Sequence, residues 1–255
     1  MADFRQLVGK RVIMTGGAGN IGRASAILMA QHGATIAIGD LDIDGANETV
    51  EMIKADGGSA LAVRTDVSVE DDIAAFVAAA VDFMGGIDVG FFNAGIQMSG
   101  AVEGFDADRW DRMFAVNPRH SFLMSKHTVP HLRNAGGGAL VLTSSIAGVK
   151  GGPGMTAYSA SKGAIVGFGR ALSAELAPDN IRVNVLCPGW VDTPFNQPAI
   201  DFMGGSEAQA EVVKSIVPLG RQAAPEEMAE VVVFLASGMS SYMTNQIIIA
   251  DGGIY

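Results

Sequence analysis

The sequence predicts an α/β fold, in which one domain over residues 1–255 forms a doubly wound parallel sheet with helices on both faces. Three observations predict it. Short apolar runs alternate with helical patterns from one end of the chain to the other. These runs are continuous rather than interrupted by polar residues, which is typical of strands buried on both faces. No linker-like or low-complexity segment divides the chain.

The apolar runs place the expected strands. The first run leads directly into a glycine cluster, and polar residues end the next two, as at a sheet edge that binds a ligand. In chain order the expected strands cover residues 12–14, 35–38, 61–63, 89–92, 139–143, 181–186 and 246–250.

The segments between the strands carry apolar residues at helical spacing. Pro118 interrupts one of them, because proline lacks an N–H group and clashes with the preceding turn. We therefore expect a kink there, or alternatively a simple helix end at Asn117. The expected helices cover residues 21–32, 44–55, 69–84, 106–133, 157–177 and 225–237, while a substrate loop at about 190–217 is irregular or helical.

The composition limits the possible functions. Hydrophobic residues make up 49% of the chain, enough for a sizeable core. The net charge of −10 disfavours nucleic acid or an anionic membrane as a partner. No signal peptide and no apolar run of membrane-spanning length is visible, so we expect a cytoplasmic protein. The single cysteine excludes an internal disulfide and a cysteine cluster for zinc, and we expect no metal.

A glycine-rich segment follows the first expected strand. Gly17, Gly19 and Gly22 fit the spacing G-x-G-x-x-G between a strand and a helix. Such glycines permit a tight turn, so that backbone N–H groups and the positive end of the helix meet a pyrophosphate. The segment therefore predicts a Rossmann-type dinucleotide site, although a plain glycine turn is the alternative.

Two aspartates end the following strands. Asp40 lies 21 residues after Gly19, where a carboxylate can accept hydrogen bonds from both adenosine-ribose hydroxyls and repel a 2′-phosphate. It therefore favours NAD over NADP, unless it is only a turn or capping residue. Asp66 suits a hydrogen bond to the adenine amino group, or else caps the helix expected from Val69.

Tyr158 and Lys162 lie four residues apart at the start of an expected helix and share one face. A phenol with a pKa of ~10 is only about 0.1% ionised at pH 7. A nearby ammonium favours the phenolate, so we expect Lys162 and a positively charged nicotinamide to lower the pKa of Tyr158 and make it an acid/base group. Ser145 could hydrogen-bond the substrate oxygen; Ser144 is its rival, and either could be a turn residue.

Together these segments resemble the short-chain dehydrogenase/reductase family over nearly the whole chain. They follow the family order: TGGAGNIG at 15–22, Asp40, Asp66-Val67, NAG at 93–95, Asn117, Ser145, YSASK at 158–162, PGWVDT at 188–193 and DGG at 251–253. The resemblance implies that Tyr158 is the acid/base and that Ser145 orients the substrate oxygen. It implies that Lys162 binds the nicotinamide ribose, and that Asn117 helps hold a water linking Lys162 to solvent.

The resemblance also implies the composition of two binding sites. The residues expected at the NAD site are Gly16, Gly19, Asn20, Ile21, Gly22, Asp40, Leu41, Asp66, Val67, Asn93, Ala94, Gly95, Tyr158, Lys162, Pro188, Gly189, Val191 and Thr193. The residues expected at a largely apolar substrate pocket are Gln97, Ser145, Met155, Tyr158, Trp190, Phe195 and Met203.

Two positions depart from the family pattern. Asn20 stands at the second glycine of T-G-x-x-x-G-x-G, and asparagine tolerates the positive φ that the turn needs. Phe92 stands where N-N-A-G has its first asparagine, which braces the structure in the family. We expect Phe92 to pack inward.

The sequence thus predicts an NAD(H)-dependent oxidoreductase that interconverts a small secondary alcohol and a ketone. Two other functions stay open: a non-catalytic NAD sensor or scaffold, and an epimerase or dehydratase of the same architecture. The resemblance also implies a homotetramer in which helices 106–133 and 157–177 pair across a two-fold axis.

Overall fold

The computed structural model describes residues 5–255 and confirms the expected fold class. In this part of the chain, parallel strands form one seven-stranded sheet in the order β3-β2-β1-β4-β5-β6-β7. The order reverses between β1 and β4, and such a reversal opens a crevice at the carboxyl ends of the strands. The strands are β1 (Arg11–Thr15), β2 (Thr35–Asp40), β3 (Ser59–Arg64), β4 (Val89–Phe92), β5 (Gly138–Thr143), β6 (Ile181–Pro188) and β7 (Ile247–Ala250).

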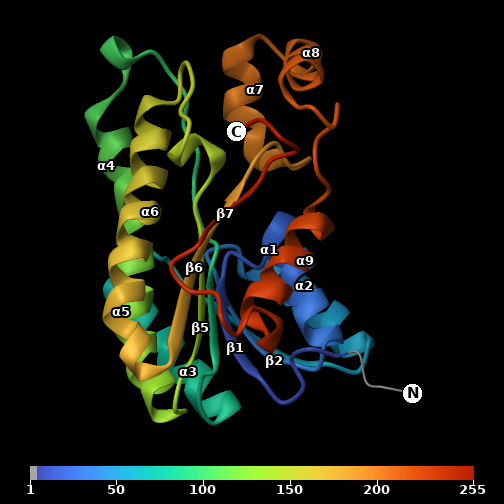
Figure 1. The fold of residues 1–255 in the computed structure, drawn as a ribbon, viewed down its shortest axis with the longest axis vertical. Helices are drawn as coiled ribbons and strands as arrows, with labels where there is room; N and C mark the ends of the chain where they lie inside the picture. The colour runs from blue at the N-terminus through green and yellow to red at the C-terminus, as the bar shows by residue number, and fades with distance from the viewer. Residues whose placement is uncertain (1–4) are drawn as a thin grey trace.

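Helices cover both faces of the sheet (Figure 1). Alternate residues of each strand point to opposite faces, so Ile13 joins the core on one side, whereas Val12 and Met14 join the core on the other. Both faces are buried, which is why the strands are continuous apolar runs. The first core includes α3 (Glu70–Met84), α5 (Pro118–Asn134) and α6 (Thr156–Leu176), and the second includes α1 (Asn20–Gln31), α2 (Ile43–Ala55) and α9 (Pro225–Ala236).

A one-residue break separates α4 (Ala107–Val116) from α5. The N–H of Asn117 still donates to the carbonyl of Met113 at 2.8 Å, as within a helix. The ψ of Asn117 is −81°, however, and Pro118 starts the next helix without an N–H to donate. The break therefore combines the two expectations, because one residue both ends α4 and begins α5.

The expected substrate loop, which the sequence predicted to be irregular or helical, contains two helices. α7 (Gln197–Met203) and α8 (Ser206–Ile216) are joined by Gly204 and Gly205, both at positive φ. In Figure 1 both helices stand above the carboxyl ends of the strands, and the C-terminus lies beside α7. These segments form the upper wall of the crevice. Within residues 5–255, no helix is long and apolar enough to span a membrane.

Candidate active site

A cavity of about 870 Å³ lies at the carboxyl ends of the strands. It brings together nearly every residue that the sequence predicted for the cofactor and substrate sites, the exceptions being Gly22 and Asn117, which lie behind its wall. The cavity also has lining residues that sequence reasoning missed, among them Thr65, Ile96, Arg112, Lys150, Phe202, Val212, Ile216 and Ile254.

The glycine loop has the geometry of a phosphate cradle. Gly16 has a φ of +74°, and Asn20 adopts a φ of +53°, so the turn survives the exchange of glycine for asparagine as expected. A Cβ at Gly22 would collide with the carbonyl oxygen of Gly16, whereas a Cβ at Gly19 would meet no atom within 4 Å. The loop is therefore closely packed beneath and open toward the cavity, where it fits the pyrophosphate of a dinucleotide.

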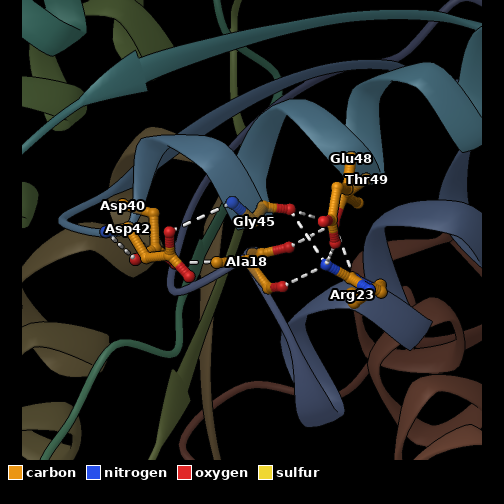
Figure 2. Close-up of polar contacts among 8 residues, drawn as sticks. Ala18, Arg23, Asp40, Asp42, Gly45, Glu48 and Thr49 are labelled. Carbon is orange, nitrogen blue, oxygen red and sulfur yellow. Dashed lines mark hydrogen bonds and ion pairs between the residues drawn. The ribbon is translucent and has the colours of Figure 1, made fainter.

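Asp40 lies at the end of β2 on the rim of the same cavity. Its Oδ2 accepts from the N–H of Ala18 at 2.9 Å, and its Oδ1 accepts from the N–H of Asp42 at 3.0 Å (Figure 2). Each carboxylate oxygen retains capacity for a second donor. Asp40 thus supports the glycine loop and can still accept hydrogen bonds from ribose hydroxyls.

Arg23 holds the glycine loop from the other side, as Figure 2 shows. Its Nη2 donates to the carbonyls of Ala18 at 2.6 Å and Gly45 at 3.0 Å and pairs with Glu48 at 2.9 Å. Its Nε donates to the hydroxyl of Thr49 at 3.0 Å. These partners lie in the glycine loop and in α2, whereas Arg23 itself lies in α1. Arg23 therefore clamps the loop and α2 to α1.

Replacing Arg23 by Ala should weaken cofactor binding, because the carbonyl of Ala18 and the Glu48 carboxylate lose this donor, while the Gly45 carbonyl keeps the hydrogen bond from the Thr49 hydroxyl. We expect the Kd for NADH to rise about tenfold, in line with the ~1–3 kcal/mol cost of leaving part-buried polar groups unpaired. Tryptophan fluorescence of the protein would measure it. Arg133→Ala is the matched control, since Arg133 forms an exposed pair with Asp179 at 2.7 Å between α5 and the segment that follows α6. Equal NADH affinity in both variants would contradict the clamp.

Tyr158, Lys162 and Ser145 line the same cavity. Tyr158 and Lys162 are both buried, one helical turn apart on α6, and the Lys162 Nζ lies 5.8 Å from the centre of the Tyr158 ring. Lys162 Nζ also donates to the carbonyl of Thr143 at 3.0 Å. The Ser145 side chain hydrogen-bonds Tyr158, whereas the rival Ser144 donates to the carbonyl of Lys162 at 2.8 Å. Of the two serines, Ser145 is therefore the one placed to contact a substrate oxygen.

The lowering of the Tyr158 pKa was expected from Lys162 and a positively charged nicotinamide together, and with the cofactor bound it stays a prediction; in the protein alone the pKa is raised. Burial raises the pKa of the Tyr158 phenol, and the hydrogen bond with Ser145 opposes this effect only in part. Burial also lowers the pKa of Lys162 to about 8. The sequence-based expectation considered the charge of Lys162 but not the loss of water around the phenol. At pH 7 these residues hold a protonated tyrosine beside a lysine that is still mostly charged.

Asn117 is buried, and its side chain is engaged in hydrogen bonds. Its Oδ1 accepts from the N–H of Ile96 at 2.9 Å, while its Nδ2 donates to the carbonyl of Ile96 at 3.0 Å and to the hydroxyl of Ser161 at 2.9 Å. The side chain thus ties the segment after β4 to α6. Its expected part in holding a water remains a prediction.

Asp66 marks the other end of the cavity. It does not cap α3, whose N-cap is Val69 without a side-chain hydrogen bond. Instead, its Oδ1 accepts from the hydroxyl of Ser68 at 2.6 Å and from the N–H of Ser68 at 2.9 Å, which lowers the pKa of Asp66. Its Oδ2 lies 3.7 Å from Arg112. An ionised Asp66 can accept from an adenine amino group.

Apolar side chains surround the substrate end. Met155 and Phe195 pack against the cluster that contains Tyr158, and the Phe195 and Tyr158 ring centres are 6.4 Å apart. Gln97 is buried in the same wall. The Lys150 ammonium donates to the carbonyl of Ile254 at 2.8 Å.

Over residues 5–255, no three His, Cys, Asp or Glu side chains gather as a metal site would require.

Comparisons with known proteins identify the family. A family model described as "Enoyl-(Acyl carrier protein) reductase" matches residues 16–255. An uncharacterized oxidoreductase, YxbG, of Bacillus subtilis is 40% identical over 98% of this chain and 92% of its own. The chain belongs to the short-chain dehydrogenase/reductase family. The 3-oxoacyl-[acyl-carrier-protein] reductase FabG of Thermotoga maritima is 36% identical, over 98% of this chain and 99% of its own. The cis-4-hydroxycyclohexanecarboxylate dehydrogenase of Sinomonas cyclohexanicum is also 36% identical, over 94% of each chain.

Solved structures of the short-chain dehydrogenase/reductase family superpose closely on the chain. A levodione reductase matches with a TM-score of 0.94 at 30% identity, over 97% of this chain and 98% of its own. A carveol dehydrogenase from Mycobacterium avium in complex with NAD matches with a TM-score of 0.93 at 27% identity, over 98% of each chain. This chain is therefore an oxidoreductase of that family with a Rossmann-type fold.

Proposed function

We propose that this protein is an NAD(H)-dependent dehydrogenase/reductase that interconverts a secondary alcohol and a ketone. One observation carries the proposal: Ser145, Tyr158 and Lys162 lie on the same cavity as the glycine loop and Asp40. A cofactor-binding cradle and a proton-transfer group thus share one cavity, as coupled hydride and proton transfer requires. The carveol dehydrogenase solved with NAD supports a nicotinamide cofactor.

The chain's own residues supply orientation and proton transfer. Ser145 donates a hydrogen bond to the substrate oxygen, and Tyr158 exchanges the proton of that oxygen. A bound oxidised nicotinamide would supply the acceptor for the hydride of the carbinol carbon. The positive charge of Lys162 opposes the burial that keeps Tyr158 protonated, and a cationic cofactor adds to that effect. With a pKa of about 8, Lys162 retains its charge near neutral pH and loses it as the pH rises above that value.

The preference for NAD over NADP rests on the residues around the part of the cavity that is expected to hold the adenosine. Asp40 places a carboxylate where a 2′-phosphate would stand, and like charges repel. Arg23 already binds two carbonyls, a hydroxyl and a carboxylate, so it is not available to neutralise such a phosphate. Both features favour a free ribose hydroxyl.

The substrate class follows from the apolar pocket. Met155, Trp190, Phe195 and Met203 offer surface for a compact hydrocarbon ring, and Gln97 offers one amide at the edge. The Sinomonas relative is named for a hydroxylated cyclohexane substrate. We therefore propose an alicyclic secondary alcohol and its ketone.

An alcohol panel followed by NADH absorbance tests this function. We expect cyclohexanol and 4-hydroxycyclohexanecarboxylate to reduce NAD faster than NADP, and faster than an acyclic alcohol of equal carbon number. A 3-hydroxyacyl thioester tests the activity for which the Thermotoga relative is named. Binding of NADH without turnover of any panel member would instead favour a sensor, and change of configuration without net NADH would favour an epimerase.

A homotetramer is the assembly we propose. The helical column of α4 and α5 exposes two large apolar side chains, Trp110 and Phe122, which a subunit contact would cover. Closed two-fold symmetry favours even-numbered assemblies. Light scattering at micromolar concentration measures the assembly, and a mass near the chain's 26.4 kDa would refute it. The cytoplasmic location stays a prediction.

A further inference from the structure

A buried histidine outside the family motifs lies beneath two loops of the cofactor site. His120, in the first turn of α5, is 1% exposed. Its Nε2 lies 2.9 Å from Oγ1 of Thr15, which is the last residue of β1 and directly precedes Gly16. His120 therefore connects α5 to the strand end from which the glycine loop starts.

The Thr15 hydroxyl also holds the loop that follows β4. The N–H groups of Asn93 and Ala94 donate to Thr15 Oγ1 at 3.2 Å and 3.3 Å. A hydroxyl has two lone pairs and one proton, so two incoming N–H donors occupy its acceptor capacity. Its own proton then needs an acceptor, and within residues 5–255 the structure places only Nε2 of His120 there.

This arrangement fixes the protonation of the imidazole ring. If Nε2 accepts from Thr15, a neutral ring carries its proton on Nδ1, which is buried without a hydrogen-bond partner among the described residues. A second proton on the ring would sit on Nε2. The Nε2–H and the Thr15 O–H would then face each other as two donors without an acceptor. Burial lowers the pKa of His120 to about 3, and the positive charge of Lys162 on α6 acts in the same direction. A neutral ring with its proton on Nδ1 accepts the Thr15 hydroxyl proton at Nε2.

Phe92 lies beside His120 in the core. Phe92 stands at the position where the family has its bracing asparagine, and its side chain is buried as expected. Its ring meets the His120 ring edge-on, with centroids 6.2 Å apart and planes at 64°. The phenylalanine fills the space, while the histidine supplies a polar contact to the strand end.

We propose that His120 is a positioning residue for the cofactor, acting as the neutral acceptor that orients the Thr15 hydroxyl toward the amides of Asn93 and Ala94. This role rests on the proposed function, because both loops are expected to line the NAD site. Asn93 adds a direct link between them, since its Nδ2 donates to the carbonyl of Gly16 at 3.1 Å. Without an acceptor at position 120, the Thr15 O–H could rotate toward the two amide N–H groups and turn a lone pair of its oxygen away from them.

Two variants separate acceptor chemistry from packing. His120→Gln places an amide oxygen near the position of Nε2, whereas His120→Leu fills similar space with no acceptor. We expect His120→Leu to raise the Kd for NADH about tenfold, with kcat within about twofold of the parent, and His120→Gln to stay within about threefold. Equal affinities in the parent, Leu and Gln proteins, measured well below their Tm values, would overturn the role even if stability fell.

Ring ¹⁵N spectra provide a readout of the tautomer in the unmutated protein itself. Of the four histidines, the signal lost in His120→Gln belongs to His120. We expect it to show the Nδ1–H tautomer unchanged from pH 8 to pH 6; the other tautomer, or titration in this range, would overturn the proposal. If the parent protein bound neither NADH nor NADPH, the proposed function would be overturned together with the role of His120. If the parent bound NADH normally and the variants bound it equally well, only the role of His120 would be overturned.

Discussion

Tyr158→Phe is expected to lower kcat for alcohol oxidation by about 10²–10⁴-fold, the usual contribution of a positioned acid/base group. The change removes one hydroxyl from a buried ring and leaves the contacts of that ring with Phe195 and Met155 in place. The fold and the glycine loop should be undisturbed, so the Kd for NADH should stay within about twofold. Stopped-flow NADH formation at saturating NAD measures the turnover.

Tyr242→Phe is the matched control, because the Tyr242 side chain is fully exposed and should leave kcat unchanged. Residual activity above about a tenth of the parent in Tyr158→Phe would show that another group moves the proton. Loss of NADH binding together with turnover would mean that the hydroxyl serves the cofactor rather than the chemistry.

Exchanging Asp40 for Ala together with Leu41 for Arg should reverse the cofactor preference. The change removes the carboxylate that favours a free ribose, and the 50% exposed side chain at position 41 leaves room for a guanidinium to pair with a 2′-phosphate. Losing one charge-assisted contact and gaining another, at ~1.5–3 kcal/mol each, corresponds to a shift of about 10²–10⁴ in the NADP to NAD ratio of kcat/KM.

The structure adds a cost to this exchange. Asp40 also accepts from the N–H of Ala18, so the double variant loses part of the support of the glycine loop, and kcat/KM with either cofactor should fall. Asp44→Ala is the control, since it removes the same charge from the exposed start of α2, outside the cavity lining. A ratio that changed equally in the control and the double variant would show that net charge, and not contact with the ribose, decides the preference.

Local patterns were sufficient to predict much of the fold. Strands buried on both faces have to be apolar at every position, so runs such as 35–38 and 139–143 were visible without any structure. The same holds for the break at Asn117, because proline chemistry acts within one helical turn. The cavity likewise collected the predicted site residues because parallel strands bring all their carboxyl ends to one edge.

Features that depend on contacts between distant segments were not predictable. The Arg23 clamp joins α1 to α2, and the His120 contact joins α5 to β1 across 105 positions of the chain. The pKa of Tyr158 depends on burial by Met155, Phe195 and their neighbours, which no spacing rule reports. Ile254 lines the cavity only because the chain end returns beside α7.

Transfer of deuterium from the carbinol carbon to the cofactor tests the central claim most directly. The alcohol with the highest rate in the panel, labelled with deuterium only at the carbon that bears the hydroxyl, would be incubated with NAD, and the reduced cofactor analysed by mass spectrometry. We predict one deuterium in each molecule of reduced cofactor and one molecule of ketone for each of them. Ketone without label in the cofactor, or labelled alcohol recovered unchanged beside bound NAD, would contradict the account.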